Sequence, residues 1–307
     1  MISNVRKWLA ACSVAFLAAC GGSDGSPTVA GVAQSDPQFS ILAEAVAAAG
    51  LENTLNGNGP FTVFAPTNTA FANLLTELGV TKAQLLADRA LLTAVLTYHV
   101  LPAEVPKASV PAGKAITTVQ GGFFKVEAAT NGGLTIQDGR NRIANIVATD
   151  VNASNGVVHV VDKVLLPANR NIVQTAQALP DFSILVEAVV AANLQGALSG
   201  TGPFTVFAPT NAAFASLLTE LGVTKEQLLA NTALLTSVLK YHVVSGRVLK
   251  ADVPVGAAIG TLETGKTFTI DSSLAITDAR NRKSNIVATD VFTSNGVIHV
   301  IDKVILP

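Results

Sequence analysis

The stretch PFTVFAPTNTAFANLLTELGVTKAQLL at residues 60–86 returns as PFTVFAPTNAAFASLLTELGVTKEQLL at residues 203–229, and three of its 27 positions differ. A second stretch, NIVATDVNASNGVVHVVDKVLLP at 145–167, returns as NIVATDVFTSNGVIHVIDKVILP at 285–307, and five of its 23 positions differ. The copies are offset by 143 and 140 residues. A period of this length suits a whole domain and is too long for a solenoid repeat. The sequence therefore predicts two copies of one domain in tandem.

Within each copy, helical patterns come before strand patterns. In the first copy, Phe39, Leu42 and Val46 share one face of a helix, and the residues 61–65 alternate like a strand. Asn155-Gly156 between two apolar runs is a strong signal for a β-hairpin. Helices followed by strands indicate an α+β fold and argue against a doubly wound sheet.

The N-terminal segment has the pattern of an export signal. Arg6 and Lys7 precede an apolar run, residues 8–19, that is too short to span a bilayer. The run ends in Leu-Ala-Ala-Cys at residues 17–20, which resembles the bacterial lipobox. That resemblance implies cleavage before Cys20 and lipid attachment to its sulfur. We therefore expect an exported, lipid-anchored envelope protein, held at the outer membrane where the cell has one.

These observations divide the chain into four parts. We assign 1–19 to a lipoprotein signal peptide, 20–35 to a flexible tether, 36–167 to the first domain and 168–307 to the second. The tether prediction follows from its Gly, Ser, Pro, Thr and Ala content without a clear period. Because the linker between the domains is very short, we expect a fixed or hinged domain orientation.

The composition excludes some classes of function. Hydrophobic residues make up 49% of the chain and charged residues 13%, which is typical of a globular protein. The formal net charge is −1 and no basic stripe is present, so nucleic acid is not an expected partner.

Three sequence blocks identify a family resemblance. FTVFAPTNxAF, then YHV, then SNGV(V/I)HV(V/I)DKV(L/I)LP occur in this order in both copies. Together they resemble the fasciclin domain, also called the FAS1 or beta-Ig-H3 domain, over 36–167 and 179–307. The resemblance implies two tandem β-wedge domains, each with two β-sheets and packed helices. It also implies a role in cell adhesion or contact with extracellular matrix.

Two motifs of animal fasciclin domains have counterparts in this sequence. An Asp-Ile pair and a Tyr-His region are linked to integrin contact in those members. Val replaces Ile in both pairs here, so the resemblance supports only a general adhesive role. The counterparts are Asp150-Val151, Asp290-Val291, Tyr98-His99 and Tyr241-His242.

The four histidines fall at equivalent places in the two copies. The two in each copy are far apart, and no Cys or closely spaced His accompanies them, which argues against a zinc site. We expect Tyr98, Tyr241 and all four histidines to be structural, and His99 to be placed where a protonated ring suits a helix C-terminus. The histidines are His99, His159, His242 and His299.

A repeated Arg-Asn-Arg motif is the best candidate for a ligand contact. Two arginines that bracket an asparagine in a loop suit an anionic sugar or a carboxylate, and the alternative is a turn with solvated arginines. With the two Asp-Val pairs, these residues form the candidate contact set. The motif residues are Arg140, Asn141, Arg142, Arg280, Asn281 and Arg282.

The leading hypothesis is a non-enzymatic adhesion or interaction protein. Two modules on one membrane-held unit raise avidity, and the expected partner is an extracellular protein or polysaccharide. One alternative is an envelope small-molecule-binding or stress-linked protein, which requires an apolar pocket with convergent polar groups. Another is a glycan hydrolase, with Asp150 and Asp162 as the carboxylate pair. No nucleophile-elbow or nucleotide-binding motif is present, so we expect no catalytic residue, cofactor or metal.

Overall fold

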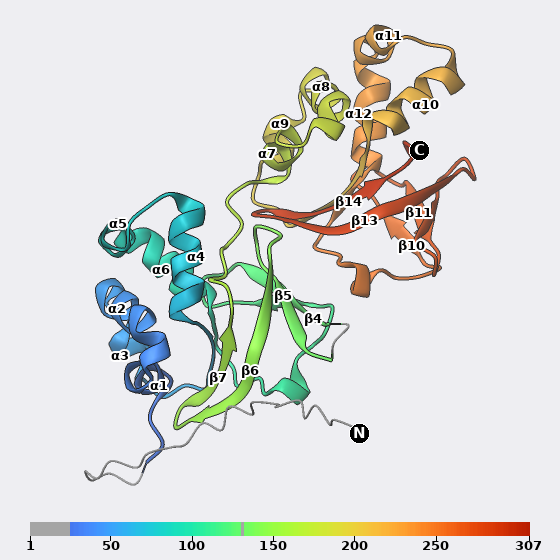
Figure 1. The fold of residues 1–307 in the computed structure, drawn as a ribbon. Coiled ribbons are helices and arrows are strands. Elements are labelled where there is room, and N and C mark those ends of the chain that lie inside the picture. Colours follow the sequence, from blue (N-terminus) through green and yellow to red (C-terminus); the bar gives the residue numbers. More distant parts are fainter. Residues whose placement is uncertain (1–24, 130–131) are drawn as a thin grey trace, which may run out of the picture.

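A computed structural model describes residues 25–129 and 132–307 of the chain (Figure 1). The predicted signal peptide and Cys20 lie outside the described residues. The described chain folds into two domains of the same design, each with helices before most of its strands. The α+β prediction is therefore confirmed.

The first domain contains six α-helices, two 3₁₀ helices and seven strands within the described residues. The α-helices are α1 (Val29–Ser35), α2 (Ser40–Ala49), α3 (Glu52–Leu55), α4 (Asn68–Leu78), α5 (Lys82–Ala87) and α6 (Arg89–Tyr98), and the 3₁₀ helices are η1 (Pro37–Phe39) and η2 (Lys107–Ser109). The strands are β1 (Phe61–Pro66), β2 (Val100–Leu101), β3 (Ala115–Thr117), β4 (Phe123–Ala128), β5 (Leu134–Gln137), β6 (Ile143–Ala153) and β7 (Gly156–Val161).

The second domain repeats this order. Its α-helices are α7 (Ile172–Gln177), α8 (Ser183–Ala191), α9 (Gln195–Leu198), α10 (Asn211–Leu221), α11 (Lys225–Ala230) and α12 (Thr232–Tyr241), and its 3₁₀ helices are η3 (Pro180–Phe182) and η4 (Lys250–Asp252). Its strands are β8 (Phe204–Pro209), β9 (Val243–Ser245), β10 (Ala258–Gly260), β11 (Thr267–Ile270), β12 (Ala275–Thr277), β13 (Lys283–Thr293) and β14 (Gly296–Ile301).

The seven strands of each domain form one continuous sheet. The order is β2-β1-β7-β6-β5-β4-β3 in the first domain and β9-β8-β14-β13-β12-β11-β10 in the second. Among the strands that the structure describes, only β1 with β7, and β8 with β14, pair in parallel. The two sheets expected in each wedge are thus joined through the long strands β6 and β13.

Each domain keeps its own hydrophobic core. One apolar cluster lies between the helices and the sheet, as with Phe39, Leu42 and Phe71 in the first domain. A second cluster, including Phe64 and Phe124, lies on another part of the sheet. The second domain repeats both clusters. Figure 1 shows the α-helices of each domain gathered on one side of its strands.

Residues 29–35, predicted as part of a flexible tether, instead form helix α1. The Thr28 side chain accepts a hydrogen bond from the backbone of Gly31 and caps the helix, while Val29 and Val32 are buried. The tether prediction was therefore wrong over this segment, because Val29, Ala30, Val32 and Ala33 supply enough apolar surface to dock a short helix. Helix α7 takes the same place in the second domain.

Candidate functional site

The two domains meet through an apolar contact between β4 of the first and β13 of the second. The rings of Phe123 and Phe292 lie 4.7 Å apart between centroids, and Leu249 and Val297 complete the cluster. The guanidinium of Arg247 lies 3.7 Å from the centre of the Phe123 ring, a cation–π geometry. The two domains are therefore in direct packing contact.

A buried ion pair crosses the same contact. Lys125 Nζ lies 2.7 Å from Asp290 Oδ2, and the two side chains are only 5% and 2% exposed. Lys125 also pairs with Glu127 at 2.8 Å. Burial acts to lower the pKa of Lys125, but its hydrogen bonds to Asp290 and Glu127 outweigh burial and raise that pKa. The lysine is therefore charged and fixed to the partner domain.

Two amide side chains add hydrogen bonds across the contact. Gln137 Nε2 donates to the backbone oxygen of Asp290 at 2.7 Å. Asn141 accepts from the backbone nitrogen of Phe292 at 2.6 Å and donates to its oxygen at 3.1 Å. The predicted ligand contacts Asn141 and Asp290 are thus used between the domains, where the closed contact keeps Asp290 from an external ligand.

The predicted Arg-Asn-Arg motif belongs to a turn built on a buried aspartate. Asp138 Oδ1 accepts from the backbone nitrogens of Arg140 and Arg142, each at 2.9 Å. Asp138 Oδ2 accepts from Leu166 N at 3.0 Å and from Arg142 Nη2 at 2.7 Å. Asn141 adopts a left-handed φ of 62° at the tip of the turn. The carboxylate therefore ties the turn to the end of the domain.

The linker between the domains passes directly over this turn. A Cβ atom at Gly139 would lie 2.3 Å from Ala168 N and 2.8 Å from Pro167 C, both backbone atoms. Only glycine fits such an approach. Ala279 occupies the equivalent position of the second domain. The first copy of the turn is therefore adapted to lie beneath the linker.

A cleft of about 560 Å³ opens beside the turn, between the two domains. Its basic side chains are Arg140, Arg142 and Arg170, and Glu77 is its acidic one. Arg142 is committed to structure, because it contacts Glu77 at 2.7 Å as well as Asp138. Burial lowers the pKa of Arg140, and the positive charges of Arg142 and Arg170 lower it further, against the opposing charges of Asp138 and Glu77.

The second copy of the motif has a different environment. Asp278 accepts from the backbone nitrogens of Arg280 and Arg282 at 2.9 Å, and Arg282 contacts Glu220 at 2.8 Å. Arg280 is exposed and borders an apolar hollow of about 80 Å³ between α10 and α12. Asn281 is also exposed, with a left-handed φ of 60°. The duplicated turns are thus alike inside and differ in what surrounds them.

The two Asp-Val pairs also differ in exposure. Asp150 and Asp290 lie at equivalent irregularities in β6 and β13, each with a φ of 59°. Asp150 is exposed and accepts from Lys107 N at 2.8 Å, whereas Asp290 is buried. Val151 packs partly against the first core, and Val291 borders the cleft.

All four histidines are buried and hydrogen bonded, and His99 is neutral. Its Nδ1 lies 2.7 Å from Val95 O, and its Nε2 accepts from Leu165 N at 2.8 Å. A proton on Nε2 would therefore point at the backbone N–H of Leu165, which is itself a donor. Burial lowers the pKa of His99 to about 4, so the predicted role of a charged ring at the helix end was wrong. His242 repeats these contacts, and burial lowers its pKa to about 4 as well.

The other two histidines hold the strand irregularities in place. His159 Nδ1 accepts from Asp150 N at 3.2 Å, and its Nε2 lies 2.9 Å from Val105 O. His299 makes the matching contacts to Asp290 N and Val248 O. Within residues 25–129 and 132–307, no group of three or more His, Cys, Asp or Glu side chains is arranged to hold a metal ion.

The two predicted tyrosines, Tyr98 and Tyr241, are buried. Tyr98 donates its hydroxyl to the backbone oxygen of Phe123, and Tyr241 donates to Thr267 O at 2.7 Å. Burial is the main cause that raises the pKa of both phenols. They therefore act as neutral structural groups.

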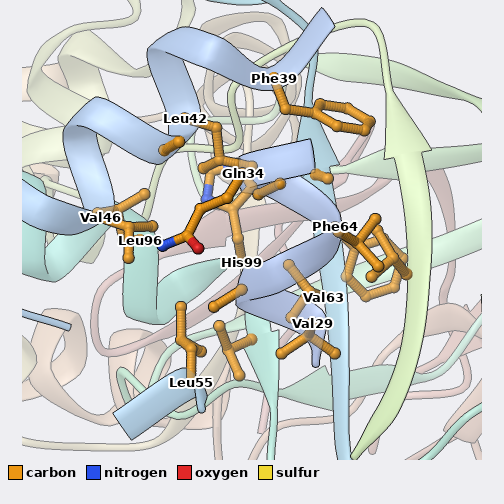
Figure 2. Close-up of a pocket in the computed structure, with 17 residues that line it drawn as sticks. Val29, Gln34, Phe39, Leu42, Val46, Leu55, Val63, Phe64, Leu96 and His99 are labelled. Carbon is orange, nitrogen blue, oxygen red and sulfur yellow. The ribbon is translucent and has the colours of Figure 1, made fainter. Parts of the chain in front are cut away.

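Each domain has an apolar pocket under its first helix, which the small-molecule alternative would need. Figure 2 shows Val29, Leu42, Leu55 and Leu96 around the one in the first domain. Each pocket encloses about 30 Å³, room for about two water molecules and far less than the roughly 300 Å³ of small ligand sites. The two polar side chains that line the first pocket, Gln34 and His99, are already hydrogen bonded. These pockets therefore do not support small-molecule binding.

The carboxylate pair considered for glycan hydrolysis is not brought together around a pocket that the structure describes. Asp162 follows β7 and accepts from the backbone and side-chain nitrogens of Asn145 at 2.7 and 2.6 Å. Asp150 lies further along β6, beside His159. Each carboxylate therefore serves its own backbone contact.

The site residues that sequence reasoning missed include Asp138, Lys125, Arg247 and Phe123. Asp138 carries a signal that could have found it, because Asp278 precedes the second Arg-Asn-Arg motif at the same spacing. The other three are specific to one copy, since Lys125, Arg247 and Phe123 correspond to Thr269, Glu104 and Thr267. The contact between the domains could have been predicted from such positions, where the side chains of the two copies differ in charge or size.

Comparison with known proteins agrees with this architecture. The model of the fasciclin domain matches residues 37–167 and 180–307. This chain belongs to the fasciclin family. Its two matched segments are tandem fasciclin domains, and they cover nearly all of the described structure.

Individual relatives share one or both fasciclin domains. The chain is 31% identical to transforming growth factor-beta-induced protein ig-h3 of Sus scrofa over 258 residues, which is 84% of this chain and 36% of that protein. It is 40% identical to protein sll1483 of Synechocystis sp. over 148 residues, 47% of this chain and 76% of that protein. The chain thus spans about a third of the length of the ig-h3 protein.

The chain also resembles a solved structure, a FAS1 domain pair from the insect cell adhesion molecule fasciclin I. The alignment covers 88% of this chain and 95% of the chain in that structure. The identity is 19% and the TM-score is 0.45.

In the described residues of this chain, no helix has both the length and the apolar character that a membrane span requires.

Proposed function

We propose that this chain is a non-enzymatic interaction protein of the cell envelope, anchored by lipid at Cys20. It presents its two fasciclin domains as one unit to an extracellular protein or polysaccharide. Membership of the fasciclin family supports an adhesive role, and the Leu-Ala-Ala-Cys signal supports the anchor.

The observation that carries this proposal is the built contact between the domains. Lys125, Phe123 and Asn141 of the first domain engage Asp290 and Phe292 of the second. Two surfaces on one unit are thereby held at a constant spacing. A constant spacing raises avidity for a ligand with repeated groups, because the second contact forms at a high effective concentration.

The state of the polar groups supports a role without bond chemistry. His99 and His242 are buried, neutral and hydrogen bonded through both ring nitrogens. General acid–base catalysis instead requires a group whose pKa lies near the working pH and that reaches its substrate. Burial has moved the pKa of both histidines well below that range.

The test of ligand binding is an array of glycans and matrix proteins probed with the chain from residue 21 onward. The proposal predicts binding to at least one array member, and weaker binding by either domain alone. A folded chain that binds no array member, or that cleaves a glycan, would contradict it.

The test of anchoring is metabolic labelling with a radioactive fatty acid. Label should enter the wild-type protein and be lost in Cys20→Ala. Cleavage before Cys20 also removes Trp8, the only tryptophan, so processed protein should lack tryptophan fluorescence. Unlabelled wild-type protein, or tryptophan emission from the envelope-extracted form, would contradict the lipid anchor.

A further inference from the structure

The cleft between the domains contains positive charge that its own carboxylate does not neutralise. Glu77 Oε2 is occupied by Arg142 Nη1 at 2.7 Å, and Arg142 also contacts Asp138. In the part of the chain that the structure describes, neither Arg140 nor Arg170 forms an ion pair. The cleft therefore has two guanidinium groups available to a ligand.

Besides Arg247, whose guanidinium lies over the Phe123 ring, Arg140 has an unsatisfied group. Its Nε is buried and has no hydrogen-bond partner among the described residues. Buried donors in native proteins are nearly always satisfied, and an exception often marks a place for a water molecule or an ion. The neighbouring charges of Arg142 and Arg170 oppose the charge of Arg140, so a bound anion would relieve that repulsion.

The size and lining of the cleft fit a small polar ligand. Its volume of about 560 Å³ lies within the range of roughly 300–1,000 Å³ for ligand sites. Leu179, which is 39% exposed, and Val291 give one apolar wall. The planar guanidinium fork matches two oxygens of a carboxylate or phosphate.

We infer that the cleft between the two domains binds an oxyanion, the carboxylate of an acidic saccharide or a phosphate group, between Arg140 and Arg170. This inference deepens the proposed function and rests on it, because it names the ligand class. The site requires both domains, since Arg140 belongs to the turn of the first and Arg170 is fixed to the second through the bond from Ser294 N to its backbone oxygen at 2.8 Å.

The duplicated turn supplies a matched control. Arg280 occupies the position of Arg140 in an identical Arg-Asn-Arg motif, but it is exposed and lies outside this cleft. Loss of Arg280 removes the same charge from the chain without changing the cleft. A comparison of the two variants therefore separates a specific site from general attraction by positive charge.

The experiment is calorimetric titration of the purified chain with glucuronate, with inorganic phosphate and with glucose as the neutral control. We expect saturable binding of at least one anion at one site per chain, and none of glucose. Tighter binding of glucuronate identifies a saccharide carboxylate as the source, and tighter binding of phosphate identifies a phosphate group.

Arg140→Ala and Arg170→Ala should each weaken the binding about tenfold, because each removes a charged hydrogen-bond donor. Arg140→Lys should retain only part of the affinity, and Arg280→Ala should leave it unchanged. Circular dichroism establishes that each variant is folded, and Arg140→Gln serves if Arg140→Ala is not. The inference is overturned if neither anion binds, or if Arg280→Ala weakens binding as much as Arg140→Ala.

The two proposals fail separately. A chain that binds array members but neither soluble anion loses only the oxyanion site. A chain that binds an anion through Arg140 but no array member keeps the site and loses the proposed interaction role.

Discussion

Asp150 and Asp290 occupy the same irregularity of the same strand in two nearly identical sequences, yet one is exposed and the other is buried. Both accept a backbone hydrogen bond at 2.8 Å, from Lys107 and from Lys250 respectively. Within the described part of the chain, only the Asp290 carboxylate has a second partner, Lys125 of the other domain. In this chain the aspartate keeps the same backbone position in both domains, and a few substitutions around it decide whether it faces solvent or the other domain.

The strongest way to break this comparison is to remove Lys125. Lys125→Met leaves Asp290 charged in a buried contact, and we expect the domain contact to lose about 3 kcal/mol. The domains should then separate, which small-angle X-ray scattering would detect as a larger radius of gyration and hydrogen exchange as faster exchange in β4 and β13. Asp150→Asn is the control and should change neither measurement. Unchanged scattering for Lys125→Met would refute the role of this ion pair.

A change of pH tests what the two domains have in common. The folded-state pKa of His99 and of His242 is about 4, below the ordinary 6.5. The unfolded chain therefore binds protons first as the pH falls, and stability that is complete above pH 6.5 is lost on the way to pH 4. From pH 7 to pH 5 we expect a loss of about 2 kcal/mol per domain in urea unfolding.

His99→Gln together with His242→Gln provides the control for that measurement. The double variant should show a weaker dependence of stability on pH over the same interval, although it begins less stable. If the dependence persists in full, other groups are responsible for it.

The smallest expected effect comes from making the second strand resemble the first. Phe292→Asn introduces the residue found at Asn152 and removes a ring that lies 4.7 Å from Phe123. We expect the contact to weaken by about 1.5 kcal/mol, the lower end for a buried aromatic ring. Hydrogen exchange in β4 and β13 measures the change, and Asn152→Phe should not alter exchange there.

Much of the fold could be predicted from the sequence because its signals are local. The Asn155-Gly156 turn, the repeat and the helical face with Phe39 and Leu42 each depend on neighbouring residues, and the structure confirms the hairpin and the buried face. Helix α1 was missed because a seven-residue helix has little signal of its own and is stabilised by docking on the core.

The candidate site could be predicted only in part. Arg140 stands out in the sequence because its motif is repeated, but nothing local shows that the linker and Arg170 enclose it. Lys125 and Asp290 form an ion pair although they lie 165 positions apart in the sequence. Only their burial between the docked domains distinguishes them from ordinary exposed charges. Long-range pairing of this kind depends on how two complete domains dock, which no single segment encodes.

The contact between the domains joins two different faces, so in principle a chain of copies could extend it without end. Three of the residues that form it occur in one copy alone: Thr267 and Thr269 stand where a further copy would need Phe123 and Lys125, and Asn152 stands where it would need Phe292. Assembly by this surface therefore stops at a pair. The protein thereby avoids growing into fibres through the same interface that fixes its two domains.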